Sequence, residues 1–210
     1  MTGRILGTYQ PQSPEWWEAR RRRIGGSDIA AVCGWSPWRS RTDLLAAKTS
    51  GTDGDTETTP KQERGIRLEQ AGLEWLAARH DLSYDPARSA ATWLHDVHDW
   101  AMYSPDGVTT GDELVEIKTT SDRSAERGWG RAGSDRVPIY YAAQVQWGMG
   151  ILGLDVTWLA VIHGATNGRP DLGLAVYRVE RNQDVFAELL RRGQRFIDEI
   201  TTGSTSWPTS

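Results

Sequence analysis

Apolar residues recur at helical spacing in three long stretches of the chain. Residues 61–80, "KQERGIRLEQAGLEWLAARH", place them on one approximate face, although two glycines weaken the pattern. Residues 139–153, "IYYAAQVQWGMGILG", predict a helix that ends at its last glycine. Residues 182–200 predict an amphipathic helix with Asn182 as N-cap. These three helices are expected to cover a core.

Shorter helical patterns occupy the first fifty residues, where capping residues and glycines punctuate the chain. Three helices are predicted there: Ser13 to about Arg23, Ser27 to Gly34, and Thr42 to about Gly51. The second would begin directly after a Gly-Gly pair. Its first backbone N–H groups have no partner within the helix, so its start is expected to be an anion-binding point.

Alternation of apolar and polar residues predicts the strands. It marks residues 89–94, 100–104 and 113–119, the last two joined through a turn near "TTGD". "DVTWLAVIHG" and "LGLAVYRVE" predict two further strands that pair with each other. Residues 51–60, "GTDGDTETTP", lack large apolar side chains and are expected to form an exposed loop. This order of elements predicts an α/β fold with a central mixed sheet flanked by helices.

Composition narrows the class of protein. A chain of 210 residues is long enough for one core, and we expect a single domain over 1–210 with a frayed tail at 203–210. The only cysteine, Cys33, excludes a disulfide within the chain and a cysteine-ligated iron–sulfur cluster, and favours a reducing, cytoplasmic location. No apolar run approaches the length of a membrane helix. The net charge of −4 argues against a protein that coats nucleic acid over its whole surface.

The stretch "YSPDGVTTGDELVEIKTT", residues 103–120, carries the chemistry. Strand alternation places Glu116 and Lys118 on one face and Ile117 on the other. If residues 103–108 pair with 114–118, Asp106 reaches the face of Glu116. Two carboxylates and the Ile117 carbonyl would form an oxygen-rich site suited to Mg²⁺ or Mn²⁺. The alternative is an ordinary hairpin with an Asp-Gly turn and a solvated Glu–Lys face.

Four blocks, in order, resemble one known family. They are "RRRRIGGSDIAAVCGWSPWRS", "RGIRLEQAGLEWL", "YSPDGV…LVEIKTT" and "VPIYYAAQVQWGMGILG", within residues 14–165. They resemble the YqaJ-like viral recombinases, relatives of phage lambda exonuclease in the PD-(D/E)XK nuclease superfamily. The resemblance implies a restriction-endonuclease-like core.

The resemblance also implies roles for the residues of the site. Asp106, Glu116 and Lys118 match the superfamily's metal-and-lysine core, in which the Ile117 carbonyl joins the metal ligands, and Glu69 matches an additional acidic metal ligand. Tyr141 and Gln144 match a Tyr-x-x-Gln pair whose polar tips face the active site. Gln146 should point elsewhere.

A further group resembles the family's pocket for a terminal 5′-phosphate. Arg20 and Ser27 lie seven residues apart, Ser104 would add a hydroxyl, and Arg123 is the remaining candidate. A guanidinium group and a helix N-terminus both bind anions, which gives this assignment a physical basis.

The implied activity is a Mg²⁺-dependent 5′-to-3′ exonuclease on linear double-stranded DNA, with Mn²⁺ as a substitute. It would leave 3′ single strands for recombination by annealing. The resemblance implies three partners: DNA ends, a single-strand annealing protein and other copies of the chain in a ring, often a trimer. Two alternatives stay open, a structure-specific or restriction-type endonuclease and a DNA-end binding module without turnover.

Overall fold

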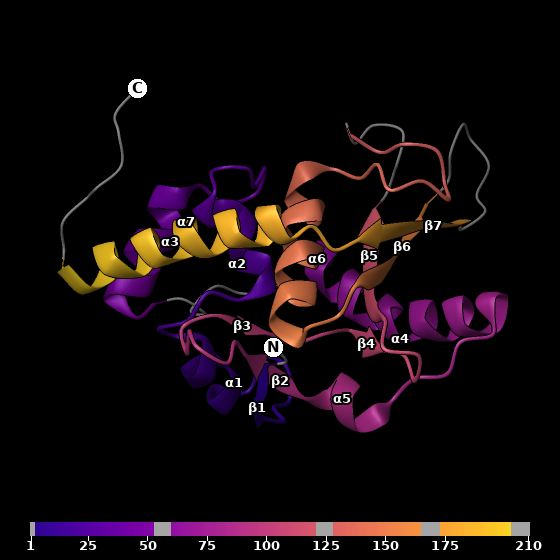
Figure 1. Cartoon of the computed structure of the whole chain (residues 1–210), viewed down its shortest axis with the longest axis horizontal. Coiled ribbons are helices and arrows are strands. Elements are labelled where there is room, and N and C mark those ends of the chain that lie inside the picture. Colours follow the sequence, from indigo (N-terminus) through magenta and orange to yellow (C-terminus); the bar gives the residue numbers. More distant parts are fainter. Residues whose placement is uncertain (1–2, 53–59, 121–127, 165–172, 203–210) are drawn as a thin grey trace.

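The computed structural model describes residues 3–52, 60–120, 128–164 and 173–202. After a first short strand, a run of helices is followed by a run of strands, and the chain then continues with a helix, two strands and a last helix (Figure 1). In chain order they are β1 (Arg4–Gly7), α1 (Pro14–Arg20), α2 (Gly26–Val32), α3 (Arg41–Ser50), α4 (Pro60–His80), α5 (Pro86–Ala90), β2 (Thr92–Leu94), β3 (Met102–Tyr103), β4 (Gly107–Val108), β5 (Leu114–Thr120), α6 (Ile139–Leu152), β6 (Val156–His163), β7 (Gly173–Glu180) and α7 (Gln183–Thr202).

Two sheets organise the described chain. The larger has the order β4-β5-β6-β7 and is mixed, because β5 and β6 are parallel while the other pairs are antiparallel. The smaller has the order β1-β2-β3 and is antiparallel throughout. The predicted mixed sheet and the predicted pairing of the last two strands are confirmed.

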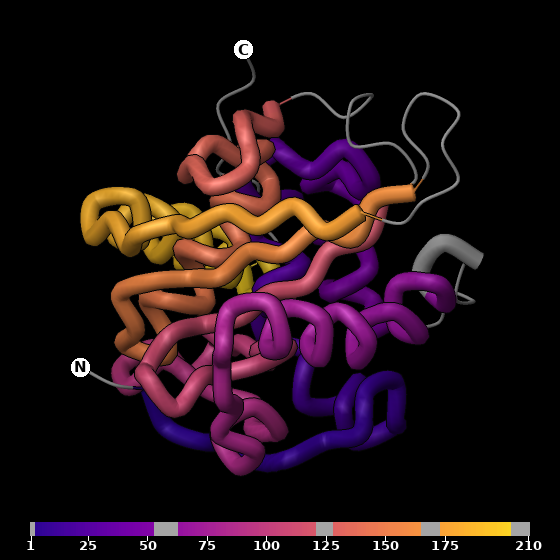
Figure 2. The backbone as a smooth tube through the Cα atoms, turned by 90° about the vertical axis from the view of Figure 1, so that its right-hand side faces the viewer, coloured from indigo at the N-terminus to yellow at the C-terminus, as the bar shows by residue number. Residues whose placement is uncertain are grey.

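Helices cover both faces of the larger sheet. On one face, Leu159, Val161 and Tyr177 pack in the cluster that contains Val145 and Trp147 of α6. On the other face, a smaller cluster of strand residues packs against α4. Figure 2 shows α4 beside the strands β5 and β6. Strands buried on both faces take apolar residues at successive positions, which explains the run "LAVI" in β6.

Gly72 weakens the helical pattern of α4, but it allows the helix to pack closely against β5. A Cβ atom at Gly72 would lie 2.8 Å from Ile117 Cγ2 of β5. The helix therefore approaches the sheet more closely than a larger residue would allow. This contact holds the part of α4 that carries Glu69 against β5.

The structure corrects several predicted boundaries near the N-terminus. The first helix ends at Arg20 instead of Arg23, because Ile24 leaves the helix and its N–H donates to the Trp100 carbonyl at 2.8 Å. The N-cap of α2 is Gly25, not Ser27: the Gly25 N–H donates to Asp28 Oδ2 at 2.9 Å. The N-cap of α3 is Ser40, not Thr42, since Ser40 Oγ accepts from the Asp43 N–H at 3.1 Å.

The predicted strand at residues 89–94 is also wrong in its first half. Residues 86–90 form α5, with Asp85 as N-cap and Pro86 at the first helical position, and the strand is confined to Thr92–Leu94. Pairing of 103–108 with 114–118 is wrong for Tyr103, which belongs to the smaller sheet. The tail at 203–210 and most of the loop at 51–60 lie outside the described residues. Among described helices, none has the length and apolar composition to cross a membrane.

Candidate active site

An open strand edge positions the first carboxylate. The strand β4 pairs only with Leu114 and Val115, so β5 continues beyond its neighbour. Asp106, which directly precedes β4, replaces the missing strand partner at this part of β5. Its Oδ2 accepts a hydrogen bond from the Ile117 N–H at 2.7 Å. Within a strand, the N–H and C=O of one residue face the same neighbour. The Ile117 carbonyl is therefore on the edge of β5 that faces Asp106.

The two polar residues of β5 share a face, as the alternation predicts. Lys118 Nζ donates to Glu116 Oε1 at 2.6 Å. Gln144 of α6 donates through Nε2 to the same Glu116 oxygen. The hydroxyl of Tyr103 donates to the other oxygen, Glu116 Oε2, at 2.5 Å. Glu116 is buried and is held by three donors, so its orientation is set from three elements of the fold.

Tyr103 is a site residue that the sequence analysis did not identify. It is fully buried between α2 and α6, where a Cβ atom at Gly26 or Gly148 would lie 2.4 or 2.5 Å from its ring. Two glycines thus make room for an aromatic ring beneath Glu116. The available signal was the position of Tyr103 directly before "SPDG", but nothing local shows which way its hydroxyl points.

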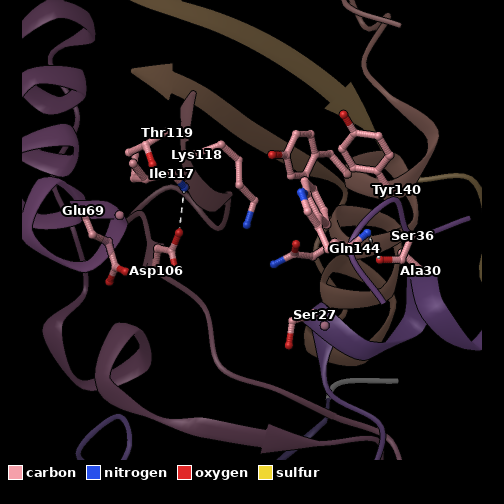
Figure 3. A pocket seen from close by; sticks show the side chains of 14 residues that line it. Ser27, Ala30, Ser36, Glu69, Asp106, Ile117, Lys118, Thr119, Tyr140 and Gln144 are labelled. Carbon is pink, nitrogen blue, oxygen red and sulfur yellow. Dashed lines mark hydrogen bonds between the residues drawn. The ribbon is translucent and has the colours of Figure 1, made fainter. Parts of the chain in front are cut away.

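A pocket of about 560 Å³ collects side chains from both faces of the sheet (Figure 3). Glu69 and Gly65 line it from α4, while Tyr141 and Gln144 line it from α6. Asp106 and Lys118 lie between them. Helices on opposite faces can contribute to one pocket because the edge of β5 is open at this point.

Tyr141 and Gln144 line the pocket, whereas Gln146, which was expected to point elsewhere, does not. The ring of Tyr141 is 5.4 Å from Lys118 Nζ, in cation–π contact. Gln146 is buried and donates through Nε2 to the Glu180 carbonyl at 2.7 Å, while its Oε1 accepts from Asn182 N–H at 2.8 Å. It therefore ties α6 to the start of α7.

Negative charge accumulates in the pocket. Burial raises the pKa of Asp106 well above its usual range, and the nearby Glu116 and Glu69 carboxylates raise it further. Burial and Glu116 likewise raise the pKa of Glu69. Burial and repulsion between neighbouring carboxylates therefore disfavour the ionised forms of Asp106 and Glu69.

Lys118 supplies the positive charge that the pocket does contain. Burial alone would lower the pKa of Lys118, but the Glu116 and Asp106 carboxylates outweigh it and raise that pKa. The ammonium group is consequently protonated at neutral pH. It can offset charge on a phosphate or orient a water molecule, but it is not a proton acceptor.

The donor set fits a hard divalent cation. Carboxylate oxygens of Asp106, Glu116 and Glu69 and the Ile117 carbonyl are the ligands that Mg²⁺ and Mn²⁺ prefer. Within the described residues, no three Asp, Glu, His or Cys side chains already converge as a complete metal site. Glu116 Oε1 accepts hydrogen bonds from Lys118 and Gln144. To bind a metal ion, this oxygen would have to give up one of these hydrogen bonds.

The predicted phosphate-binding residues are only partly brought together. Arg20 is buried and donates to Ser27 Oγ at 2.9 Å. Ser27 is exposed and lines the pocket, whereas neither Arg20 nor Ser104 does. Ser104 Oγ instead shares a hydrogen bond of 2.9 Å with Thr92 Oγ1. Arg123 lies outside the described residues.

Arg20 belongs to a buried ionic network beside the pocket. Its guanidinium lies 3.1 Å from Asp28 Oδ2, and Lys48 Nζ lies 3.3 Å from the same oxygen. Burial alone would raise the pKa of Asp28, but Lys48 and Arg20 more than offset it and lower the pKa from 3.8 to about 2. Arg20 Nε, also buried, has no hydrogen-bond partner among the described residues.

We expect Asp28→Asn to lower the free energy of unfolding at pH 7 by about 3–5 kcal/mol, because Lys48 would remain buried without its carboxylate. Since the folded pKa is below the unfolded one, Asp28 stabilises the fold above pH 4 and loses that effect as pH falls towards 2. Urea unfolding between pH 2 and 7 measures both effects.

The matched control is Asp155→Asn, which breaks an ion pair with Arg181 whose Asp155 side chain is 80% exposed. It should cost at most about 1 kcal/mol. Equal losses in the two variants would contradict the buried network.

Comparisons with known structures show a shared fold. Structures with the same fold include an alkaline exonuclease from Laribacter hongkongensis, with TM-score 0.67 and 18% identity over 91% of this chain and 94% of that one. A second structure of that exonuclease holds dAMP. A phage-related exonuclease from Haemophilus somnus matches with TM-score 0.59 and 9% identity over 87% and 96% of the two chains.

Sequence comparison leads to one family. The protein YqaJ of Bacillus subtilis is 26% identical over 140 residues, which make up 66% of this chain. The match spans 42% of YqaJ, less than half of that protein. The model of the YqaJ-like viral recombinase domain matches residues 15–155, about two thirds of the chain. The chain therefore belongs to the YqaJ-like viral recombinase family.

Proposed function

We propose that this protein is a Mg²⁺-dependent 5′-to-3′ exodeoxyribonuclease that acts on linear double-stranded DNA and leaves 3′ single strands for annealing. The observation that carries the proposal is the meeting of Asp106, Glu116 and Lys118 at the open end of β5, with Glu69 beside Asp106 in the same pocket. Family membership and the shared fold of two exonucleases support it. The dAMP bound to the Laribacter enzyme is in keeping with a DNA substrate.

The residues of the site would have three roles: metal binding, positioning of the phosphate or water, and orientation of Glu116. Asp106, Glu116, Glu69 and the Ile117 carbonyl would hold a divalent cation, which when bound acidifies water and stabilises charge on a phosphate. Protonated Lys118 would position the scissile phosphate or the attacking water beside these carboxylates. Tyr103 fixes one oxygen of Glu116, and Gln144 steadies the other from α6.

The end of the DNA would be recognised by its terminal phosphate. Ser27 offers a hydroxyl at the pocket wall, and the buried Arg20 behind it contributes positive charge. Ser104 and Arg123 complete the proposed group. The family resemblance extends the proposal to a single-strand annealing protein as partner and to a ring-shaped homo-oligomer, whose mass light scattering measures directly.

Digestion of three substrates with Mg²⁺ tests the proposal: linear duplex with 5′-phosphate, the same duplex with 5′-hydroxyl, and covalently closed circle. A fourth reaction omits Mg²⁺ from the 5′-phosphate duplex. We expect hydrolysis of linear DNA only, dependent on Mg²⁺, and faster from the 5′-phosphate. Ser27→Ala should reduce the phosphate preference by roughly 2- to 10-fold, the scale of one hydrogen bond. Arg20→Ala should reduce it further.

Because Arg20 also pairs with Asp28, thermal unfolding of Arg20→Ala separates lost recognition from lost stability. Cleavage of closed circles, or equal rates from both ends, would favour an endonuclease. A phosphate preference unaffected in both variants would place the anchor elsewhere.

A further inference from the structure

The pocket has a second end, which the proposed chemistry does not use. In Figure 3, Glu69 and Asp106 lie on one side and Tyr140 on the other, with Lys118 and Gln144 between them. Residues that line the second end carry no ionisable carboxylate or basic group; they are Ala30, Ser36, Trp38 and Tyr140. The pocket therefore changes from charged to uncharged and aromatic along its length.

Trp38 is the largest side chain at this end, and it is 57% exposed. Its ring centroid lies 4.8 Å from that of Tyr140, with an angle of 75° between the planes, and 5.7 Å from that of Tyr141. An indole is a large apolar surface, and at this exposure much of the Trp38 ring stays in contact with solvent.

The loop that carries Trp38 is anchored to the pocket wall. Both Trp35 and Ser36 donate their N–H groups to the Ala30 carbonyl at the end of α2, at 2.8 and 3.2 Å. The Trp38 N–H donates to Ser36 Oγ at 3.2 Å. The backbone that leads to the exposed indole is thus held to α2, and Ser36 in turn holds the Trp38 N–H, so the ring is presented at a defined place.

We infer that Trp38 and Tyr140 form a stacking shelf for one nucleobase of the DNA strand whose phosphate lies at Asp106 and Lys118. This inference rests on the proposed function and adds the part of the substrate that the shelf receives. A flat uncharged base suits an aromatic wall without ionisable groups, whereas the phosphate requires the charged end. The volume of about 560 Å³ is in the range of small-ligand sites.

A stacking shelf also suits an enzyme that removes every nucleotide in turn. All four bases have a π-face, so stacking binds them without a choice of sequence. Base-edge hydrogen bonds would instead favour particular bases. We therefore expect the shelf to accept purines and pyrimidines alike, with purines held more tightly because of their larger rings.

Calorimetric titration of the whole protein in Mg²⁺ with dAMP and with 2-deoxyribose 5-phosphate tests the shelf. Both ligands carry the phosphate, and only dAMP carries a base. The wild type should bind dAMP more tightly by roughly tenfold, the scale of one stacked base. Trp38→Ala should remove this difference and leave the affinity for 2-deoxyribose 5-phosphate unchanged. Trp38→Phe should retain most of it.

Trp75→Ala is the control, since Trp75 is an exposed tryptophan on α4 that does not line this pocket. It should leave both affinities unchanged. Unaltered dAMP binding in Trp38→Ala, or an equal loss for both ligands, would overturn the shelf, as would a wild type that does not distinguish them.

The titration involves no turnover, so the two proposals can fail separately. A base-dependent affinity without DNA hydrolysis would contradict the exonuclease and leave the shelf in place. Hydrolysis without a base-dependent affinity would contradict the shelf alone.

Discussion

Lys118→Ala is expected to lower the rate of DNA hydrolysis by roughly 10²–10⁴-fold, the range seen when a group that acts at the reacting centre is removed. The ammonium group is the positive charge nearest to the carboxylates of the pocket, 2.6 Å from Glu116. Without it, neither a phosphate nor a water molecule would be positioned beside them. Because one lost phosphate contact changes affinity only modestly, DNA binding should weaken by less than about tenfold.

Single-turnover digestion and fluorescence anisotropy on the same end-labelled duplex separate the two quantities. Lys118→Arg is an informative second variant, since it keeps the charge but replaces a compact ammonium with a planar fork. It should remain strongly impaired. Near wild-type hydrolysis by Lys118→Ala would remove Lys118 from the active site, and the same loss in both binding and rate would indicate a docking role.

Asp106→Asn is expected to abolish hydrolysis by weakening metal binding. The amide oxygen can still accept the Ile117 N–H that Asp106 now accepts at 2.7 Å, so the local fold should persist. The lost negative charge is what a divalent cation requires. We expect Mn²⁺ affinity to fall by more than the roughly 10- to 100-fold typical of losing an outer partner of a metal ligand.

Calorimetric titration with Mn²⁺ provides the measurement, and thermal unfolding without metal provides the folding control. Asp106 lies close to Glu116 and Glu69, so removal of its charge relieves repulsion. The metal-free variant should therefore melt at or above the wild-type temperature. Unchanged Mn²⁺ affinity in a folded variant would contradict the proposed role of Asp106, and a large loss of stability would show that its charge supports the fold instead.

Several elements were predictable because their cause is local. The alternation in "VEIK" places Glu116 and Lys118 together in any strand, and the structure confirms it. Asn182 caps α7 through its own side chain, accepting from Val185 N–H at 3.1 Å. Residues 139–152 form a helix closed by Gly153 in the left-handed region, with φ of 72°. Each pattern concerns neighbours in sequence, whose geometry depends little on the rest of the chain.

Other expectations failed where a competing contact, from a neighbouring residue or from a distant segment, overrode a local signal. Ser27 is a favourable N-cap residue, but Asp28 accepts the Gly25 N–H and shifts the cap by two positions. The first helix has arginines suited to continue it, yet Ile24 leaves to bond with Trp100. Tyr103 reads as part of a strand next to β5, yet it packs between two glycines and joins the smaller sheet.

The sequence by itself determined that Glu116 and Lys118 share a strand face, because spacing along a regular backbone sets this relation. It also determined the family through the order of four blocks. Only the tertiary structure decided that β4 stops after two residues, that Asp106 occupies the vacated edge of β5, and that Glu69 and Gln144 reach one pocket from opposite faces. Those facts depend on packing between segments far apart in the chain, where a close contact such as Gly72 against Ile117 sets the distance between helix and sheet.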